Sequence, residues 1–145
     1  MQVEVEIKLA FSASRVWTLA GGYDLLPSIS TNTTSSRLED GGRIRVLVNR
    51  DGSVLWEQLL DFDESRRTMS YLITDAKAFN GAYGPGYRGR VTIVEVDQQN
   101  SIFRYSADFE PTAAFTEEKA RLAVQSFAND CALGISRVLS RPVFV

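Results

Sequence analysis

The hydrophobic pattern changes period near residue 115, and this change most constrains the fold. From Phe115 to Leu139, apolar residues recur every three or four positions and polar residues occupy the opposite side, which predicts one long amphipathic helix. Its apolar stripe consists of Ala120, Ala123, Val124, Phe127, Cys131, Gly134, Ile135 and Val138. No other large helical element is available, so this helix must cover the apolar face of whatever precedes it.

The preceding chain has the pattern of β-strands. Residues 3–9 alternate apolar and charged side chains, as in a strand with one buried face. Later segments are rich in β-branched residues and predict strands at 32–38, 43–49, 54–62, 67–75, 88–97 and 101–110. Most of the links between them are short and turn-like, so consecutive strands are expected to pair as antiparallel hairpins.

Two short helices are expected after the first strand. Ser12 stands at an N-cap position and Gly21-Gly22 follows the apolar residues of the first helix, while residues 23–28 predict a second helical turn. We therefore predict an α+β fold in which a seven-stranded antiparallel sheet wraps around a long C-terminal helix. The 145 residues are expected to form a single domain.

Composition excludes several functions. With 16 Lys and Arg against 18 Asp and Glu, the net charge is −2, so no basic field attracts nucleic acid. The chain has no His and only one Cys, Cys131, which removes His-based catalysis, internal disulfides and cysteine-rich metal sites, and we expect neither cofactor nor metal. Neither a signal peptide nor an apolar run of membrane-spanning length is present, so a cytoplasmic location is expected.

Several short motifs resemble those of a known superfamily. They are Val16-Trp17 with Leu26-Pro27-Ser28-Ile29, Gly42-Arg43-Ile44-Arg45 with Asp51-Gly52, Glu57 to Glu64 with Tyr71-Leu72-Ile73, and Tyr105 to Pro111. In order and spacing they resemble the helix-grip fold of the START-like, Bet v 1-like (SRPBCC) superfamily, and most closely its polyketide cyclase/dehydrase branch.

The resemblance implies a deep, mostly apolar cavity between the sheet and the C-terminal helix. It predicts a protein that binds a lipophilic or aromatic small molecule there and promotes its cyclisation and dehydration without a cofactor. Relatives with this fold also include carriers, hormone receptors and chaperone activators. The alternative function is therefore a non-catalytic carrier or sensor of a hydrophobic ligand, and a third possible function is a protein-interaction module.

Glu57 is the main candidate for acid/base chemistry. It lies between Leu55 and Leu59 on one strand face, and the family motif directs it to the cavity, although an exterior Glu is the structural alternative. In the predicted reaction Glu57 moves a proton, and Arg45 with a tyrosine of the 80–87 link, Tyr87, stabilises developing enolate charge.

The position of Arg45 depends on the hairpin turn. A three-residue loop at Arg50-Asp51-Gly52 places Arg45 opposite Glu57, as the family motif suggests. A two-residue turn at Asp51-Gly52 places Arg45 opposite Gln58 instead, and binary patterning favours this register. In the first register, an ion pair with Arg45 makes Glu57 a weaker base. The same register places an apolar surface on the outer face of the sheet, which a homodimer would cover. This surface consists of Ile44, Val46, Val48, Val54 and Trp56.

The remaining candidates are expected to contact the ligand. They occupy inward positions by strand or helix period or by family match, and are Leu59, Tyr71, Ile73, Tyr83, Val91, Tyr105, Phe109, Phe127 and Asp130. Tyr83 and Tyr87 lie in the same glycine-rich link, and the sequence does not decide which of them faces the cavity. Cys131 is expected to be inert packing.

Overall fold

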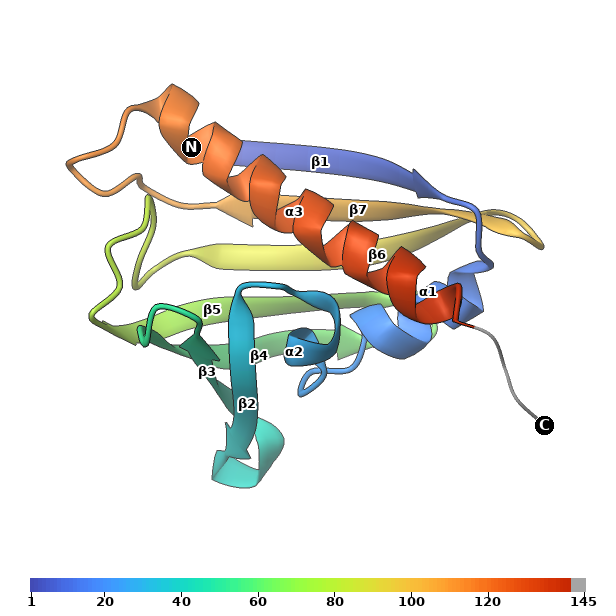
Figure 1. Cartoon of the computed structure of the whole chain (residues 1–145), viewed down its shortest axis with the longest axis horizontal. Coiled ribbons are helices and arrows are strands. Elements are labelled where there is room, and N and C mark those ends of the chain that lie inside the picture. Colours follow the sequence, from blue (N-terminus) through green and yellow to red (C-terminus); the bar gives the residue numbers. More distant parts are fainter. Residues whose placement is uncertain (142–145) are drawn as a thin grey trace.

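The computed structural model describes residues 1–141 and has the predicted fold (Figure 1). Its elements are β1 (Gln2–Leu9), α1 (Ala13–Ala20), α2 (Leu26–Ile29), β2 (Thr33–Glu39), the 3₁₀ turn η1 (Asp40–Gly42), β3 (Ile44–Asn49), β4 (Val54–Asp63), β5 (Thr68–Lys77), β6 (Arg88–Asp97), β7 (Asn100–Asp108) and α3 (Glu117–Leu139). The predicted strands and the long helix are confirmed, with ends that differ by at most two residues.

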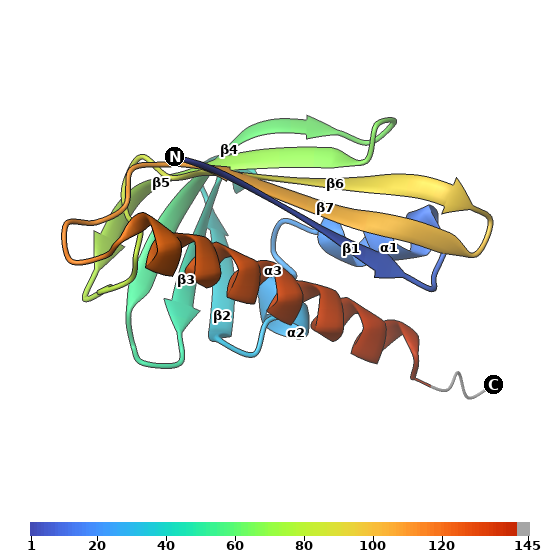
Figure 2. The same ribbon diagram turned by 90° about the horizontal axis from the view of Figure 1, so that it is seen from above.

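The seven strands form one antiparallel sheet in the order β1-β7-β6-β5-β4-β3-β2. Because β1 pairs with β7, the first and last strands of the chain lie side by side. Helix α3 crosses one face of this sheet, and α2 lies beside it (Figure 2). Helix α1 packs on β6 and β7, so all three helices cover the same inner face.

The core lies between this inner face and α3. Alternate residues of the strands are buried there, among them Val3, Ile73, Val91 and Tyr105, as the strand period predicts. Other residues whose period or motif directs them inward are also buried, namely Val16, Ile93 and Phe109. Leu59, Phe127 and Val138 are half-buried.

Two helix starts follow from local sequence. The Ser12 hydroxyl accepts a hydrogen bond from the Arg15 amide, which confirms the predicted cap of α1. Thr116 caps α3 in the same way through the Lys119 amide, and Glu117 and Glu118 in the first turn complement the helix dipole. Helix α3 therefore begins two residues later than the apolar pattern alone suggests.

Helices α2 and α3 approach each other at Gly134. A methyl group at this position would overlap the carbonyl oxygen of Ile29, so only glycine allows the contact. This close approach places α2 under the sheet, where Leu26 and Ile29 are buried in the core. It thereby sets one wall of the site described next.

Candidate functional site

A buried ion pair joins β3 and β4. The loop Arg50-Asp51-Gly52 has three residues, with Gly52 at φ 86°, and Asn49 pairs with Ser53 across it. Arg45 is therefore directly opposite Glu57, which confirms the first of the two registers. The Arg45 Nε lies 2.7 Å from Glu57 Oε1, and the side chains are only 4% and 5% exposed. Glu57 faces the interior, as the family motif implies.

Aromatic rings and a backbone carbonyl hold the guanidinium of Arg45. It lies 4.5 Å from the ring centre of Tyr23 and 4.8 Å from that of Tyr71, and its Nη1 donates to the Tyr23 carbonyl oxygen at 3.2 Å. Burial disfavours the charge, but the Glu57 carboxylate and the two tyrosines outweigh burial, so the pKa of Arg45 is raised. Arg45 is fixed in both charge and position.

The ion pair leaves two polar atoms without a protein partner. Within residues 1–141, no hydrogen bond engages Arg45 Nη2 or Glu57 Oε2, and only one oxygen of the carboxylate meets the guanidinium. No fully enclosed side-chain nitrogen or oxygen of these residues lacks a hydrogen-bond partner. It follows that both atoms have room beside them for water or for a ligand atom.

Three tyrosine hydroxyls form a chain in the core. The Tyr105 hydroxyl lies 2.6 Å from that of Tyr71 and 2.7 Å from that of Tyr87. Gly89 makes this possible, because a Cβ there would lie 2.6 Å from the Tyr105 oxygen. Burial, together with the neighbouring tyrosines, raises the pKa of all three phenols, so they remain protonated at neutral pH.

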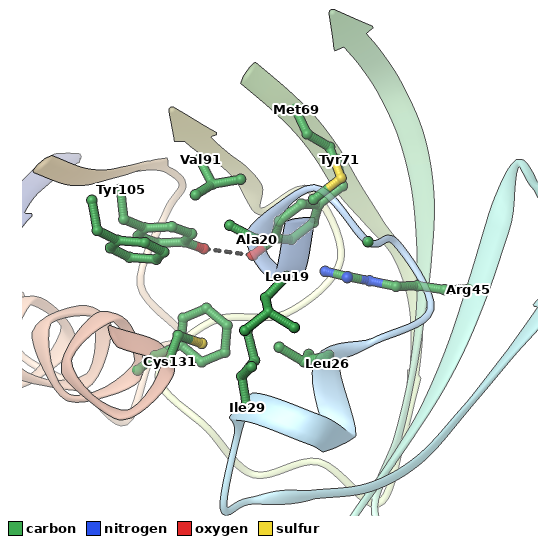
Figure 3. A pocket seen from close by; sticks show the side chains of 13 residues that line it. Leu19, Ala20, Leu26, Ile29, Arg45, Met69, Tyr71, Val91, Tyr105 and Cys131 are labelled. Atoms are coloured by element: carbon green, nitrogen blue, oxygen red, sulfur yellow. Dashed lines mark hydrogen bonds between the residues drawn. The ribbon is translucent and has the colours of Figure 1, made fainter. Parts of the chain in front are cut away.

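Two small cavities adjoin these groups. The larger, about 40 Å³, includes Arg45 and Cys131 in its lining, and the smaller, about 30 Å³, includes Glu57, Tyr83 and Tyr87. Four residues line both cavities: Leu26, Tyr71, Tyr105 and Phe127. Figure 3 shows the guanidinium of Arg45 directed into the larger cavity, which is otherwise mostly apolar. Each cavity holds only a few water molecules.

The interior is therefore more closed than the family resemblance suggests. Pockets for drug-sized ligands have volumes of roughly 300 Å³ or more, whereas aromatic side chains fill most of this space. The link between β5 and β6 adds to the closure, because Tyr83 stacks on Tyr87 with ring centres 4.4 Å apart. Thr112 anchors the link through hydrogen bonds to the carbonyl oxygens of Gly81 and Ala82.

Sequence and fold comparisons agree with this architecture. Residues 1–137 match the sequence pattern of the family described as polyketide cyclase / dehydrase and lipid transport. The chain belongs to this family. Among curated proteins, none matches the chain.

Solved structures of similar fold cover nearly the whole chain of this polyketide cyclase/dehydrase family member. The protein XoxI from Bacillus cereus is 25% identical, with a TM-score of 0.85 and 94% of each chain covered. A START superfamily protein from Mycobacterium smegmatis is 12% identical, with a TM-score of 0.75 over 94% of this chain and 95% of that chain. Norcoclaurine synthase from Thalictrum flavum, in complex with dopamine and hydroxybenzaldehyde, is 17% identical, with a TM-score of 0.74 over 99% of this chain and 89% of that one.

Most of the candidate residues of this family member lie together at the two cavities. The larger cavity is lined by Arg45 and Val91, the smaller by Glu57, Tyr83 and Tyr87, and both by Tyr71, Tyr105 and Phe127. Tyr83 and Tyr87 therefore both face the interior.

Four candidates lie outside the cavity linings. Ile73 and Phe109 are buried in the core, and Leu59 packs against it half-buried. Asp130 was also expected to contact ligand; it lies outside both linings, and its carboxylate accepts hydrogen bonds from Ser30 Oγ at 2.9 Å and Thr31 Oγ1 at 2.7 Å. Asp130 fixes the segment between α2 and β2.

Two residues of the site have roles that the sequence did not indicate. Tyr23 stacks on Arg45 and donates its hydroxyl to the Glu57 carbonyl oxygen at 2.6 Å, but it lies in an irregular segment where no period marks it as inward. Cys131 packs in the helix stripe as predicted and also lines the larger cavity. Burial raises the pKa of its thiol to about 12, so it is a poor nucleophile at neutral pH.

Neither a membrane helix nor a metal cluster accompanies this site in residues 1–141. None of the helices there has the length and apolar character needed to cross a membrane. Nor do three or more metal-ligating side chains of His, Cys, Asp or Glu gather at one place in that range.

Proposed function

We propose that this protein binds a small lipophilic or aromatic molecule inside the space between the sheet and α3. The observation that carries the proposal is an apolar interior in which a buried ion pair leaves one donor, Arg45 Nη2, and one acceptor, Glu57 Oε2, without a protein partner in residues 1–141. Polar atoms are costly to bury without partners, and a bound molecule would satisfy both. Its family and the similar folds support the same function.

Binding without chemistry is the version that the geometry favours. Glu57 is the only carboxylate in the cavity linings of residues 1–141, and Arg45 holds one of its oxygens at 2.7 Å. A general base must give up its negative charge when it accepts a proton. Protonation of Glu57 would leave the buried Arg45 charge without a counter-charge, which opposes that role.

Cyclisation with dehydration is the second candidate function. It is favoured by one observation: Glu57 and the hydroxyls of Tyr83, Tyr87 and Tyr105 belong to residues that line the same 30 Å³ cavity. In this reaction the free oxygen of Glu57 moves a proton, while Arg45 and Tyr87 stabilise the developing enolate. The raised pKa of Tyr87, caused by burial, keeps it protonated as a donor.

Glu57→Gln separates the two candidates. The test uses a panel of aromatic and polyketide-like molecules, with binding followed by tryptophan fluorescence and product formation by mass spectrometry. A binding protein gives altered affinity and no product with either form. Measured at a temperature where the variant remains folded, an enzyme gives product that decreases about 10²- to 10⁴-fold with affinity nearly retained. If no molecule of the panel binds, the ligand-binding proposal is wrong.

We also propose that two copies associate through the outer face of β3 and β4, in the cytoplasm. Val46 is already buried there by its neighbours, so the apolar surface is smaller than the sequence suggested. Ile44, Val48, Val54 and Trp56 remain half-buried on that face.

A further inference from the structure

The tyrosine chain has one hydrogen more than it can use internally. Three hydroxyls, of Tyr71, Tyr105 and Tyr87, carry three hydrogens, but only two hydrogen bonds link them. No acceptor in residues 1–141 takes the third hydrogen. If both bonds run in the same direction along the chain, one end presents this spare donor and the opposite end presents only oxygen lone pairs; if both ends donate to Tyr105, the spare hydrogen lies on Tyr105.

The two cavities contain charged groups of opposite hydrogen-bonding character, and Tyr71 and Tyr105 line both cavities. Arg45 lines the larger cavity with Tyr71, and a guanidinium is only a donor. Glu57 lines the smaller cavity with Tyr87, and a carboxylate is only an acceptor. Among residues 1–141, the larger cavity has no acidic side chain in its lining and the smaller has no basic one. The linings therefore assign an acceptor to the part of the ligand in the larger cavity and a donor to the part in the smaller one. A chain in which Tyr87 donates to Tyr105 and Tyr105 to Tyr71 places its spare hydrogen on the same side as Arg45.

We propose that the ligand is a neutral molecule of about one ring that carries a carbonyl oxygen at one end and a hydroxyl group at the other. The carbonyl oxygen accepts from Arg45 Nη2 and from the Tyr71 hydroxyl in the larger cavity. The ligand hydroxyl donates to Glu57 Oε2 or to the Tyr87 oxygen in the smaller one. This inference rests on the proposed ligand-binding function and specifies its ligand class.

Charge and size support the neutral, small ligand. Among residues 1–141, only Arg45 and Glu57 are charged in the linings of these two cavities, and they neutralise each other, so a charged ligand would be buried without a counter-ion. The cavities hold only a few water molecules, which limits the ligand to about one ring while the side chains stay in place. Burial of Tyr71 and Tyr87 raises the pKa of both phenols, so the hydrogen count holds at neutral pH.

Matched probes test the ligand class directly. Para-hydroxyacetophenone has the proposed pair of groups, para-methylacetophenone replaces the hydroxyl by a methyl group of similar size, para-ethylphenol lacks the carbonyl oxygen, and para-diacetylbenzene has two acceptors. Affinities are measured by calorimetry at mildly acidic pH, where the phenols are neutral. We expect para-hydroxyacetophenone to bind about tenfold to a hundredfold more tightly than the other three, because each of them leaves a buried group unpaired.

Tyr105→Phe tests the role of the chain itself. Without the central hydroxyl, Tyr71 and Tyr87 each keep a free hydrogen, so both ends become donors. The affinity for para-diacetylbenzene should therefore increase relative to that for para-hydroxyacetophenone. Tyr23→Phe is the matched control, since its hydroxyl is committed to the Glu57 carbonyl oxygen outside the chain. The control should keep the order of affinities seen in the wild type.

The outcomes distinguish this inference from the broader proposal. If all four probes bind with similar affinity, ligand binding stands and the inferred ligand class is wrong. A preference for para-diacetylbenzene in the wild type also overturns it. If none of the probes binds while larger aromatic molecules do, the size and class are both wrong, and if nothing binds, the proposed function fails as well. The wild-type panel decides these points even if Tyr105→Phe does not fold.

Discussion

Replacing Glu57 by Gln should strongly destabilise the fold, because it leaves the Arg45 charge buried without its partner. The pair is close, at 2.7 Å, and the two side chains are 4% and 5% exposed. Removing one partner of such a pair costs about 3–5 kcal/mol in the free energy of unfolding. For a domain of this size, each kcal/mol lowers the melting temperature by roughly 2–4 °C, so we expect a decrease of about 6–20 °C.

Removing both charges should restore much of this stability. The double variant Arg45→Met with Glu57→Leu replaces the pair by apolar groups of similar size, a change that is often neutral or stabilising by about 1–4 kcal/mol. One loss remains, since the Tyr23 carbonyl oxygen no longer accepts from Arg45, which costs about 1 kcal/mol. The double variant should therefore be close to the wild type and clearly more stable than Glu57→Gln.

The assay is urea unfolding followed by the fluorescence of Trp17 and Trp56. Glu39→Gln is the matched surface control: its pair with Arg37 is 3.2 Å long but 44% to 61% exposed, and such pairs contribute about 1 kcal/mol or less. If Glu57→Gln is no less stable than Glu39→Gln, the buried ion pair is not the source of stability argued above. If the double variant is as unstable as the single one, the cost lies in lost packing rather than in an unpaired charge.

Four other perturbations test the packing, the tyrosine chain and the surface. Gly134→Ala should destabilise the fold in urea, because overlap with Ile29 costs more than the ~1 kcal/mol that alanine gains in helix propensity. The free energy of unfolding should fall as the pH rises above 10.0, the ordinary tyrosine pKa, because burial keeps the phenols protonated in the folded state while they ionise on unfolding. In urea titrations at several pH values, the free energy of unfolding of Tyr105→Phe should fall less steeply than that of the wild type. Sedimentation should give twice the 16.1 kDa chain mass for the wild type and a single chain for Trp56→Glu, and a monomeric wild type contradicts the homodimer. Phe127→Ala should cost about 2 kcal/mol in urea, less than the 3–5 of a fully buried Phe, and a larger loss would place Phe127 in the packed core.

The fold could be predicted because each element carries a local signal. Strand alternation and the helical stripe of α3 depend only on which residues face the core, and the caps at Ser12 and Thr116 are short-range. The register of the hairpin between β3 and β4 was harder to predict, because the two possible turns around Asp51-Gly52 place Arg45 on opposite faces of the sheet. The family motif indicated the correct one, whereas binary patterning favoured the wrong one because it treats a buried charge as an error.

The site was only partly predictable because its contacts join distant segments. Glu57, Arg45 and the tyrosines were identified from strand period and motif, but Tyr23 meets Arg45 through an irregular segment that has no period. Asp130 illustrates the reverse case: the helix pattern places it beside the apolar stripe, and only tertiary structure shows its hydrogen bonds to Thr31. The closed interior depends on how several aromatic rings pack together, which no single segment specifies.

The buried ion pair itself is better explained by recognition than by stability. Apolar residues of similar volume at Arg45 and Glu57 would be expected to support the fold equally well or better. What they would not supply is a donor in the lining of the larger cavity and an acceptor in the lining of the smaller one, each with one atom left free. A tyrosine chain in which Tyr87 donates to Tyr105 and Tyr105 to Tyr71 has the same polarity, because its spare hydrogen then lies beside the guanidinium. In that arrangement the core has the hydrogen-bonding pattern of a site for one oriented molecule.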